Sequence, residues 1–182
     1  MRGQTPSQTI GPFFAHALTA GATAYRPPVC GDLADEACEG RPIRVEGRVV
    51  DGNGEGVSDG MVEVWQADAR GEYRSDSGFR GFGRFGTDAS GRFRVRTVKP
   101  GPAAPGAAPH LHLAVFARGM LNHAFTRVYF SDESEANRSD PVLSSVPADR
   151  RETLVARCRN GEAIYDYEIV LQGKRETVFF DV

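Results

Sequence analysis

The chain has 182 residues, a length that suits one domain of ordinary size. Its 22 Lys and Arg residues and 24 Asp and Glu residues leave a net charge of −2, which excludes the strongly basic balance typical of nucleic-acid-binding proteins. No apolar run approaches the roughly 20 residues of a membrane span, and the first residues do not have the apolar stretch of a secretory signal. We therefore expect no membrane partner and no nucleic-acid partner.

Residues 1–42 lack the periodicity of a helix or a strand. The segment holds turn and breaker residues in TPSQTIGPFF (5–14), and several prolines and glycines follow. We therefore expect an irregular N-terminal arm. Because Phe13 and Phe14 must bury their rings, the arm is expected to pack on its own domain or on a neighbouring subunit.

From residue 43 onward the sequence predicts short strands separated by turns. Apolar and charged residues alternate at 43–49 and again at 92–98, with the period of two that is typical of half-buried strands. The segments DGNGEG (51–56) and TDASG (87–91) are rich in turn-forming residues. A strand at 61–68 is predicted to be buried and contains the single tryptophan. Further strands are expected at 110–116, 126–130, 164–171 and 177–180.

Helix signals are few. Leu154, Val155 and Cys158 lie at helical spacing and predict a helix over 148–157, and a short turn is expected around 131–137. About seven short strands with one or two short helices indicate an all-β fold, a β-sandwich spanning 43–182 that is preceded by the arm 1–42.

The number and spacing of the cysteines indicate whether the protein resides in a reducing or an oxidising compartment. Cys30, Cys38 and Cys158 are sparse, odd in number and without metal-binding spacing. These features favour reduced thiols and a cytoplasmic protein, and a disulfide between Cys30 and Cys38 is the alternative.

The segment GFGRFG (81–86) has the glycine spacing of a dinucleotide-binding loop. Such a loop needs a strand before it and a helix after it, because the helix N-terminus holds the pyrophosphate. Here a turn and a predicted strand follow, so nucleotide binding is not expected.

His110 and His112 are candidate metal ligands. They occupy positions i and i+2 of a predicted strand, so both imidazoles point to the same face. Imidazole suits iron, zinc and copper, although a His-x-His pair is also a common structural feature and a metal would need further ligands. Arg118 and Arg127 follow, and a guanidinium group matches both oxygens of a carboxylate.

Phrases spread over nearly the whole chain resemble the intradiol ring-cleaving dioxygenases. They are TPSQTIGPFF, VEVWQADARGEYR, GRFRVRTVKPG, PHLHLAVFARG, TRVYFSDE, RRETL and ETVFFDV. The resemblance implies a β-sandwich in a heteromer of alpha and beta chains, where the beta subunit holds a non-haem Fe(III) with two tyrosinates and two histidines. It also implies O2-dependent cleavage of protocatechuate, 3,4-dihydroxybenzoate, to 3-carboxy-cis,cis-muconate.

Matched residue by residue, the resemblance implies an incomplete ligand set in this chain. Tyr73 stands at the first tyrosinate position, and His110 and His112 stand at the two histidine positions. Ala103 stands where the second tyrosinate belongs, and Ala107 replaces a flanking arginine of the iron-bearing chains. We therefore expect an alpha-type chain with a vestigial site, no catalytic residue and no metal of its own, and iron in the partner beta subunit.

The resemblance also gives this chain a part in the partner's substrate pocket. Thr9, Gly11 and Pro12 match the part of the arm that lines this pocket, and Arg118 matches an arginine near the carboxylate of protocatechuate.

Two alternatives stay open. One is a self-sufficient intradiol dioxygenase that holds iron with the three residual ligands and an unidentified oxygen ligand. The other is a non-catalytic, prealbumin-like β-sandwich module that binds a partner.

Overall fold

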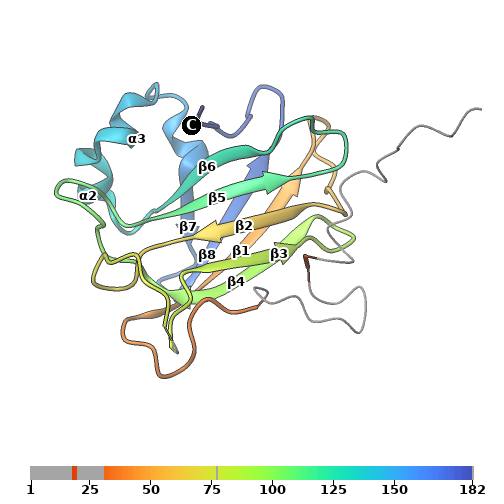
Figure 1. The fold of residues 1–182 in the computed structure, drawn as a ribbon. Coiled ribbons are helices and arrows are strands. Elements are labelled where there is room, and N and C mark those ends of the chain that lie inside the picture. Colours follow the sequence, from red (N-terminus) through yellow and green to blue (C-terminus); the bar gives the residue numbers. More distant parts are fainter. Residues whose placement is uncertain (1–17, 20–30, 77, 182) are drawn as a thin grey trace, which may run out of the picture.

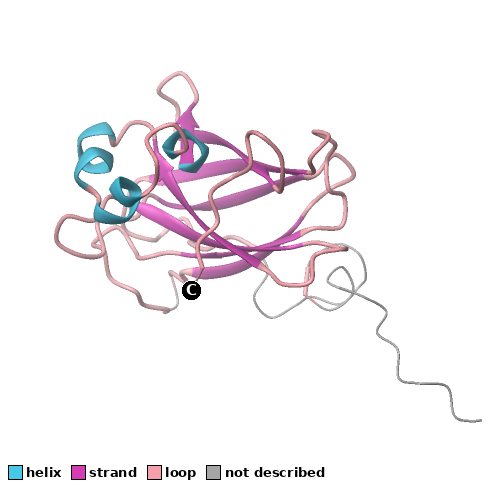
Figure 2. Ribbon diagram, turned by 90° about the horizontal axis from the view of Figure 1, so that it is seen from above, coloured by secondary structure: helices cyan, strands magenta, loops and turns pink. Residues whose placement is uncertain are grey.

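Two facing layers of β-strands make up the body of the computed structural model, which describes residues 18–19, 31–76 and 78–181 (Figures 1 and 2). The strands are β1 (Pro42–Val50), β2 (Met61–Trp65), β3 (Phe82–Gly86), β4 (Arg92–Val98), β5 (His110–Phe116), β6 (Ala124–Phe130), β7 (Val155–Cys158) and β8 (Ile164–Val170). The short helices α2 (Ser134–Ser139) and α3 (Pro141–Ser145) and the 3-10 helix η1 (Arg151–Leu154) lie between β6 and β7.

The strands follow the order β3-β2-β5-β6-β7-β8-β1-β4. The first sheet, β3-β2-β5-β6, is antiparallel throughout. In the second sheet, β1 pairs antiparallel with β4 and parallel with β8. Strand β7 joins the two sheets, since it pairs with β6 on one side and with β8 on the other. The predicted all-β sandwich is confirmed.

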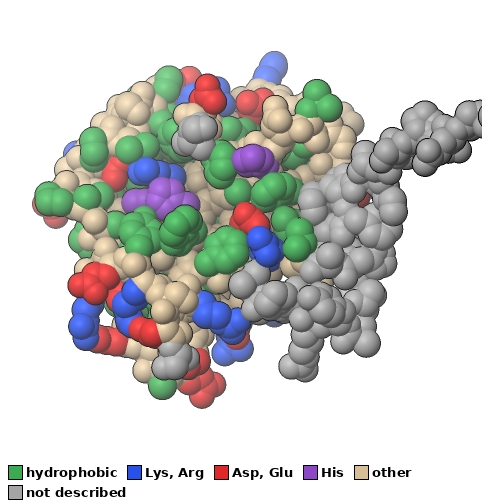
Figure 3. Space-filling model, in the orientation of Figure 1, with side chains coloured by type: hydrophobic (Ala, Val, Ile, Leu, Met, Phe, Trp, Pro, Cys, Tyr) green, Lys and Arg blue, Asp and Glu red, His purple; other side chains and the backbone are tan. Residues whose placement is uncertain are grey.

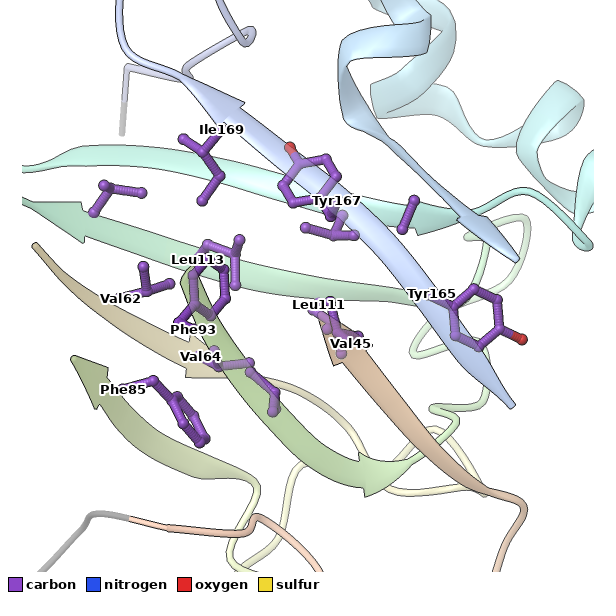
Figure 4. Close-up of a cluster of buried hydrophobic side chains, with 14 of the residues drawn as sticks. Val45, Val62, Val64, Phe85, Phe93, Leu111, Leu113, Tyr165, Tyr167 and Ile169 are labelled. Atoms are coloured by element: carbon purple, nitrogen blue, oxygen red, sulfur yellow. The ribbon is translucent and has the colours of Figure 1, made fainter. Parts of the chain in front are cut away.

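The core lies between the two sheets, where alternate residues of each strand meet (Figure 4). Val62, Val64, Leu111 and Leu113 point inward from the first sheet, and aliphatic and aromatic side chains of the second sheet face them (Figure 4). The members contributed by the second sheet include Val45, Val49, Phe93, Val95, Tyr165, Tyr167 and Ile169.

Gly47 shows how tightly this core is packed. It pairs across the second sheet with Phe93, and a Cβ at position 47 would lie 2.1 Å from the Phe93 ring. A side chain at this position would therefore displace an aromatic ring from the core, and glycine is required by the close approach.

Two predicted elements are wrong in their detail. Residues 148–157 do not form a helix: they contain η1, and the chain continues as β7 from Val155. The pairing of Val155 with Tyr129 of β6, distant in sequence, overrides the local helical spacing. Residues 177–180 form no strand, and a single bridge joins Phe180 to Phe125.

Other differences are smaller. The strand predicted at 61–68 ends at Trp65, whose side chain is 57% exposed rather than buried. Residues 82–86, considered above for their glycine spacing, form strand β3. Where a turn was expected around 131–137, the chain has a short turn at 131–132 and then α2, which begins at Ser134.

The described residues also bear on the membrane and cysteine predictions. None of the helices within them combines the length and the apolar character that a membrane crossing requires. Cys38 and Cys158 are free thiols. Cys30 and the candidate arm residues Thr9, Gly11 and Pro12 lie outside the described residues.

Candidate functional site

The paired histidines lie on the outer face of the first sheet. Leu111 and Leu113 of β5 point into the core, so His110 and His112 point to the opposite face. His112 lies between Trp65 of β2 and Arg127 of β6 in the register of the sheet. Figure 3 shows histidine side chains on this face, with a basic side chain and hydrophobic side chains beside them.

Three donor atoms converge at this point, as the resemblance implies. His112 Nε2 lies 3.1 Å from His110 Nε2 and 3.0 Å from the Tyr73 hydroxyl oxygen. His110 Nδ1 lies 2.8 Å from the Ala108 carbonyl oxygen, to which it donates its hydrogen, so His110 Nε2 is an acceptor. His112 Nε2 then donates to His110, because two unprotonated ring nitrogens would otherwise face each other. The Tyr73 hydroxyl hydrogen therefore has no acceptor within the cluster and points away from it.

The electrostatics of the cluster keep it uncharged. Burial, the neighbouring His110 and the Arg127 cation together lower the pKa of His112 to about 4, and burial is the largest of these causes. Burial also lowers the pKa of His110 and raises the pKa of the Tyr73 phenol. At neutral pH the cluster therefore holds two neutral imidazoles and a protonated phenol.

The donor set has a spacing that suits a metal ion but lacks the oxygen ligands that ferric iron requires. Two ligand atoms about 2.1 Å from an ion and at right angles to each other are about 3.0 Å apart, which matches the spacing of the cluster. The described residues contain no group of three or more His, Cys, Asp and Glu side chains that could hold a metal, and Ala103 brings only a methyl group to the second tyrosinate position. A single phenol and two imidazoles do not supply the anionic oxygen ligands of an Fe(III) centre, so the residues present do not fit it.

A buried carboxylate shapes the loop that presents Tyr73. Asp68 accepts hydrogen bonds from the backbone N–H groups of Arg70 (2.8 Å) and Glu72 (3.0 Å) and from the Arg74 guanidinium. Burial raises the pKa of Asp68, but these hydrogen bonds outweigh burial and hold its pKa below the usual value. The tight turn at 68–72 delivers Tyr73 to the cluster.

The segment carrying Ala103 packs directly on this turn. Gly71 has a φ of +85°, and a Cβ there would lie 2.1 Å from the Pro102 carbonyl oxygen. The Gly101 N–H donates to the Asp68 carbonyl oxygen at 2.8 Å. Position 103 therefore adjoins the loop that presents Tyr73, and the resemblance implies such proximity for the two tyrosinate positions.

Asp140 supports His110 through the backbone of Ala108. This residue was not predicted from the sequence. Its carboxylate is 1% exposed and accepts from Leu143 N (2.8 Å), Tyr129 Oη (3.0 Å) and Ala108 N (2.8 Å). Ala108 in turn receives the hydrogen bond from His110. Asp140 is the N-cap of α3 and precedes a proline, a signal from which the cap was predictable but not its link to the site.

Arg118 lies away from the cluster. Its side chain is 74% exposed and forms an ion pair with Asp59, with Nε 2.5 Å from the carboxylate oxygen. Six residues of nearly extended chain separate it from His112, a distance of about 20 Å. The structure therefore does not bring this predicted substrate-binding residue together with Tyr73, His110 and His112.

Comparisons with known proteins agree with the strand architecture. The family model described as "Dioxygenase" matches residues 10–173. The chain is 47% identical to a protocatechuate 3,4-dioxygenase alpha chain from Burkholderia cepacia, with 98% of each chain covered. It is 32% identical to the beta chain from the same organism, over 94% of this chain and 77% of that one.

The fold is similar to that of solved dioxygenases. The dioxygenase domain of a dioxygenase–carbohydrate-binding protein fusion from Streptomyces sp. SirexAA-E superposes with a TM-score of 0.62 at 25% identity. That match covers 97% of this chain and 100% of the other.

Proposed function

The chain belongs to the intradiol dioxygenases, among their protocatechuate 3,4-dioxygenase alpha chains, and on this premise we propose that it supports catalysis in a partner subunit. The reaction is the O2-dependent cleavage of protocatechuate to 3-carboxy-cis,cis-muconate, with Fe(III) in the beta subunit. The observation that carries this proposal is the ligand cluster of this chain, which has three donors and a methyl group at Ala103. In the partner, iron supplies the activation of the substrate.

The contribution of this chain to that pocket comes from two regions. Arg118 places a cation near the substrate carboxylate, which orients the ring. Residues Thr9, Gly11 and Pro12 of the arm 1–42 line the pocket. The exposure of Arg118 and its separation from the cluster support this role, because an exposed arginine in the turn after β5 is accessible to a neighbouring subunit.

The two alternatives have less support. A self-sufficient enzyme needs a further oxygen ligand. The segment next to the Tyr73 loop has Ala103 at the matching position, and its methyl group cannot bind a metal. A free-standing binding module does not account for a relative that matches 98% of the chain, including the arm and the C-terminal end.

The proposal is tested by producing this chain alone and together with its beta partner. Iron content, visible absorbance and O2 uptake with protocatechuate are measured on each sample. We expect the chain alone to be colourless and inactive, and the complex to be red and active. A red, active chain without a partner would contradict the vestigial site, and an inactive complex would contradict the supporting role.

Restoring a phenol at position 103 tests the vestigial site directly. We expect Ala103→Tyr to give a chain that binds Fe(III) and shows a tyrosinate-to-iron charge-transfer band in the visible spectrum. The matched control is Ala104→Tyr, since Ala104 is the exposed neighbour on the same loop. No band in the Ala103→Tyr chain would mean that the site has lost more than one ligand.

A further inference from the structure

Arg127 is a half-buried cation whose charge no carboxylate balances. Across the described residues, no Asp or Glu oxygen lies within ion-pair distance of its guanidinium, although most of the arginines around the second sheet form such pairs. The carboxylate of Asp140 accepts three hydrogen bonds, one of them from the Tyr129 hydroxyl, with which Arg127 also interacts. A partly desolvated cation without a counter-charge favours an anionic ligand.

The charge of Arg127 makes the cluster of Tyr73, His110 and His112 favour an anion over a metal cation. It lies beside His112 in the sheet register, and its charge acts on Tyr73, His110 and His112. A fixed positive charge beside three uncharged donor groups repels a metal ion and attracts an anion. The Tyr73 hydroxyl, whose hydrogen is not used within the cluster, is a hydrogen-bond donor for the same anion.

An aromatic cleft shares Tyr73 with this cluster. It has a volume of about 370 Å³, and it is lined by the aromatic residues Trp65, Tyr73 and Phe82 together with Arg74, Ser75 and Arg80. The Trp65 and Tyr73 rings meet edge to face with their centroids 5.9 Å apart, and Trp65 is 57% exposed. A planar ring stacks well against such walls, and the volume is in the range of small-molecule sites.

We propose that this face of the chain binds a small aromatic carboxylate without transforming it. The carboxylate pairs with Arg127 and accepts from the Tyr73 hydroxyl, and the ring lies in the cleft beside Trp65. The proposal rests on the proposed function and goes beyond the supporting role, because it gives this chain a ligand of its own.

The test counts binding sites in the assembled complex. The probe is radiolabelled 4-hydroxybenzoate, which lacks the second hydroxyl and is not cleaved, and binding is measured by equilibrium dialysis. We expect two equivalents per alpha–beta pair. In the Arg127→Gln complex the second equivalent should bind about 5- to 30-fold more weakly, because a charge-assisted contact is lost. The control is Arg157→Gln, an exposed arginine of β7 for which the described residues provide no ion pair.

A second readout uses the full chain purified by itself. Trp65 is its single tryptophan, so its fluorescence reports on the cleft. We expect 4-hydroxybenzoate to quench it in the parent chain and much less in Arg127→Gln. One equivalent per pair in the parent complex, or unchanged binding in Arg127→Gln, would overturn the proposal. So would dissociation of the Arg127→Gln complex, because Arg127 would then pair with a carboxylate of the partner subunit.

Discussion

Replacing Asp140 with alanine is expected to lower the free energy of unfolding by about 4 kcal/mol. The substitution leaves the Ala108 N–H, the Leu143 N–H and the Tyr129 hydroxyl without their acceptor, and each unsatisfied buried group costs about 1–3 kcal/mol. It also removes the cap of α3, which contributes about 1 kcal/mol. Urea denaturation of the parent and variant complexes measures the difference.

The control for this experiment is Asp149→Ala, since Asp149 is exposed in the same region of the chain. Its effect should be within about 0.5 kcal/mol, as for most surface substitutions. An Asp140→Ala variant as stable as the control would show that the hydrogen bonds of Asp140 are replaceable by water.

The same carboxylate predicts a dependence of stability on pH. Burial raises the pKa of Asp140, but the hydrogen bonds from Leu143, Ala108 and Tyr129 outweigh burial and hold its pKa below the usual value. Its contribution is therefore complete above the unfolded pKa of about 3.9 and is lost as the pH falls through the lower folded pKa. The stability difference between parent and Asp140→Ala should shrink in that acidic range.

The second large effect concerns Arg118. In the assembled complex, Arg118→Ala is expected to raise KM for protocatechuate by about 10- to 100-fold, which corresponds to the loss of about 1.4 to 2.8 kcal/mol of charge-assisted bonding to the carboxylate. Because Arg118 is exposed and its ion pair with Asp59 lies at the surface, stability should hardly change. Steady-state kinetics of the two complexes provide the measurement.

The Asp59→Asn variant distinguishes the effect of the Arg118 charge from the effect of its ion pair with Asp59. This variant removes the partner of Arg118 but keeps its cation, so KM should stay close to the parent value. If Arg118→Ala and Asp59→Asn behave alike, or if KM is unchanged in both, Arg118 does not contact the substrate.

The alternation of apolar and charged residues was sufficient to predict most of the sheet. It predicts the strands at 43–49 and 92–98. The strand expected at 110–116 places His110 and His112 on one face, because side chains of a strand alternate strictly. The alternation of inward and outward side chains also predicts that Trp65 is exposed. Val62 and Val64 point into the core, so the residue after Val64 had to point outward.

Contacts between distant segments were not predictable from local pattern. Tyr73 reaches the cluster through a turn that depends on Asp68, and no periodicity describes such a turn; only the family resemblance placed it. Asp140 is one carboxylate whose partners lie 3, 11 and 32 residues away in the chain. Arg127 is distinctive because no carboxylate among the described residues forms an ion pair with it. Only the folded chain shows this.

The parallel pairing of β1 with β8 has a consequence for biogenesis. Arg44 lies beside Ile164, so the first and last strands of the described residues meet in one sheet, with about 120 residues between them. The ribosome must release nearly the entire chain before the second sheet can close, because β1 has β4 on one edge and awaits β8 on the other. We therefore expect folding to be slow and post-translational, with chaperones shielding the exposed edge of β1 until the chain is complete.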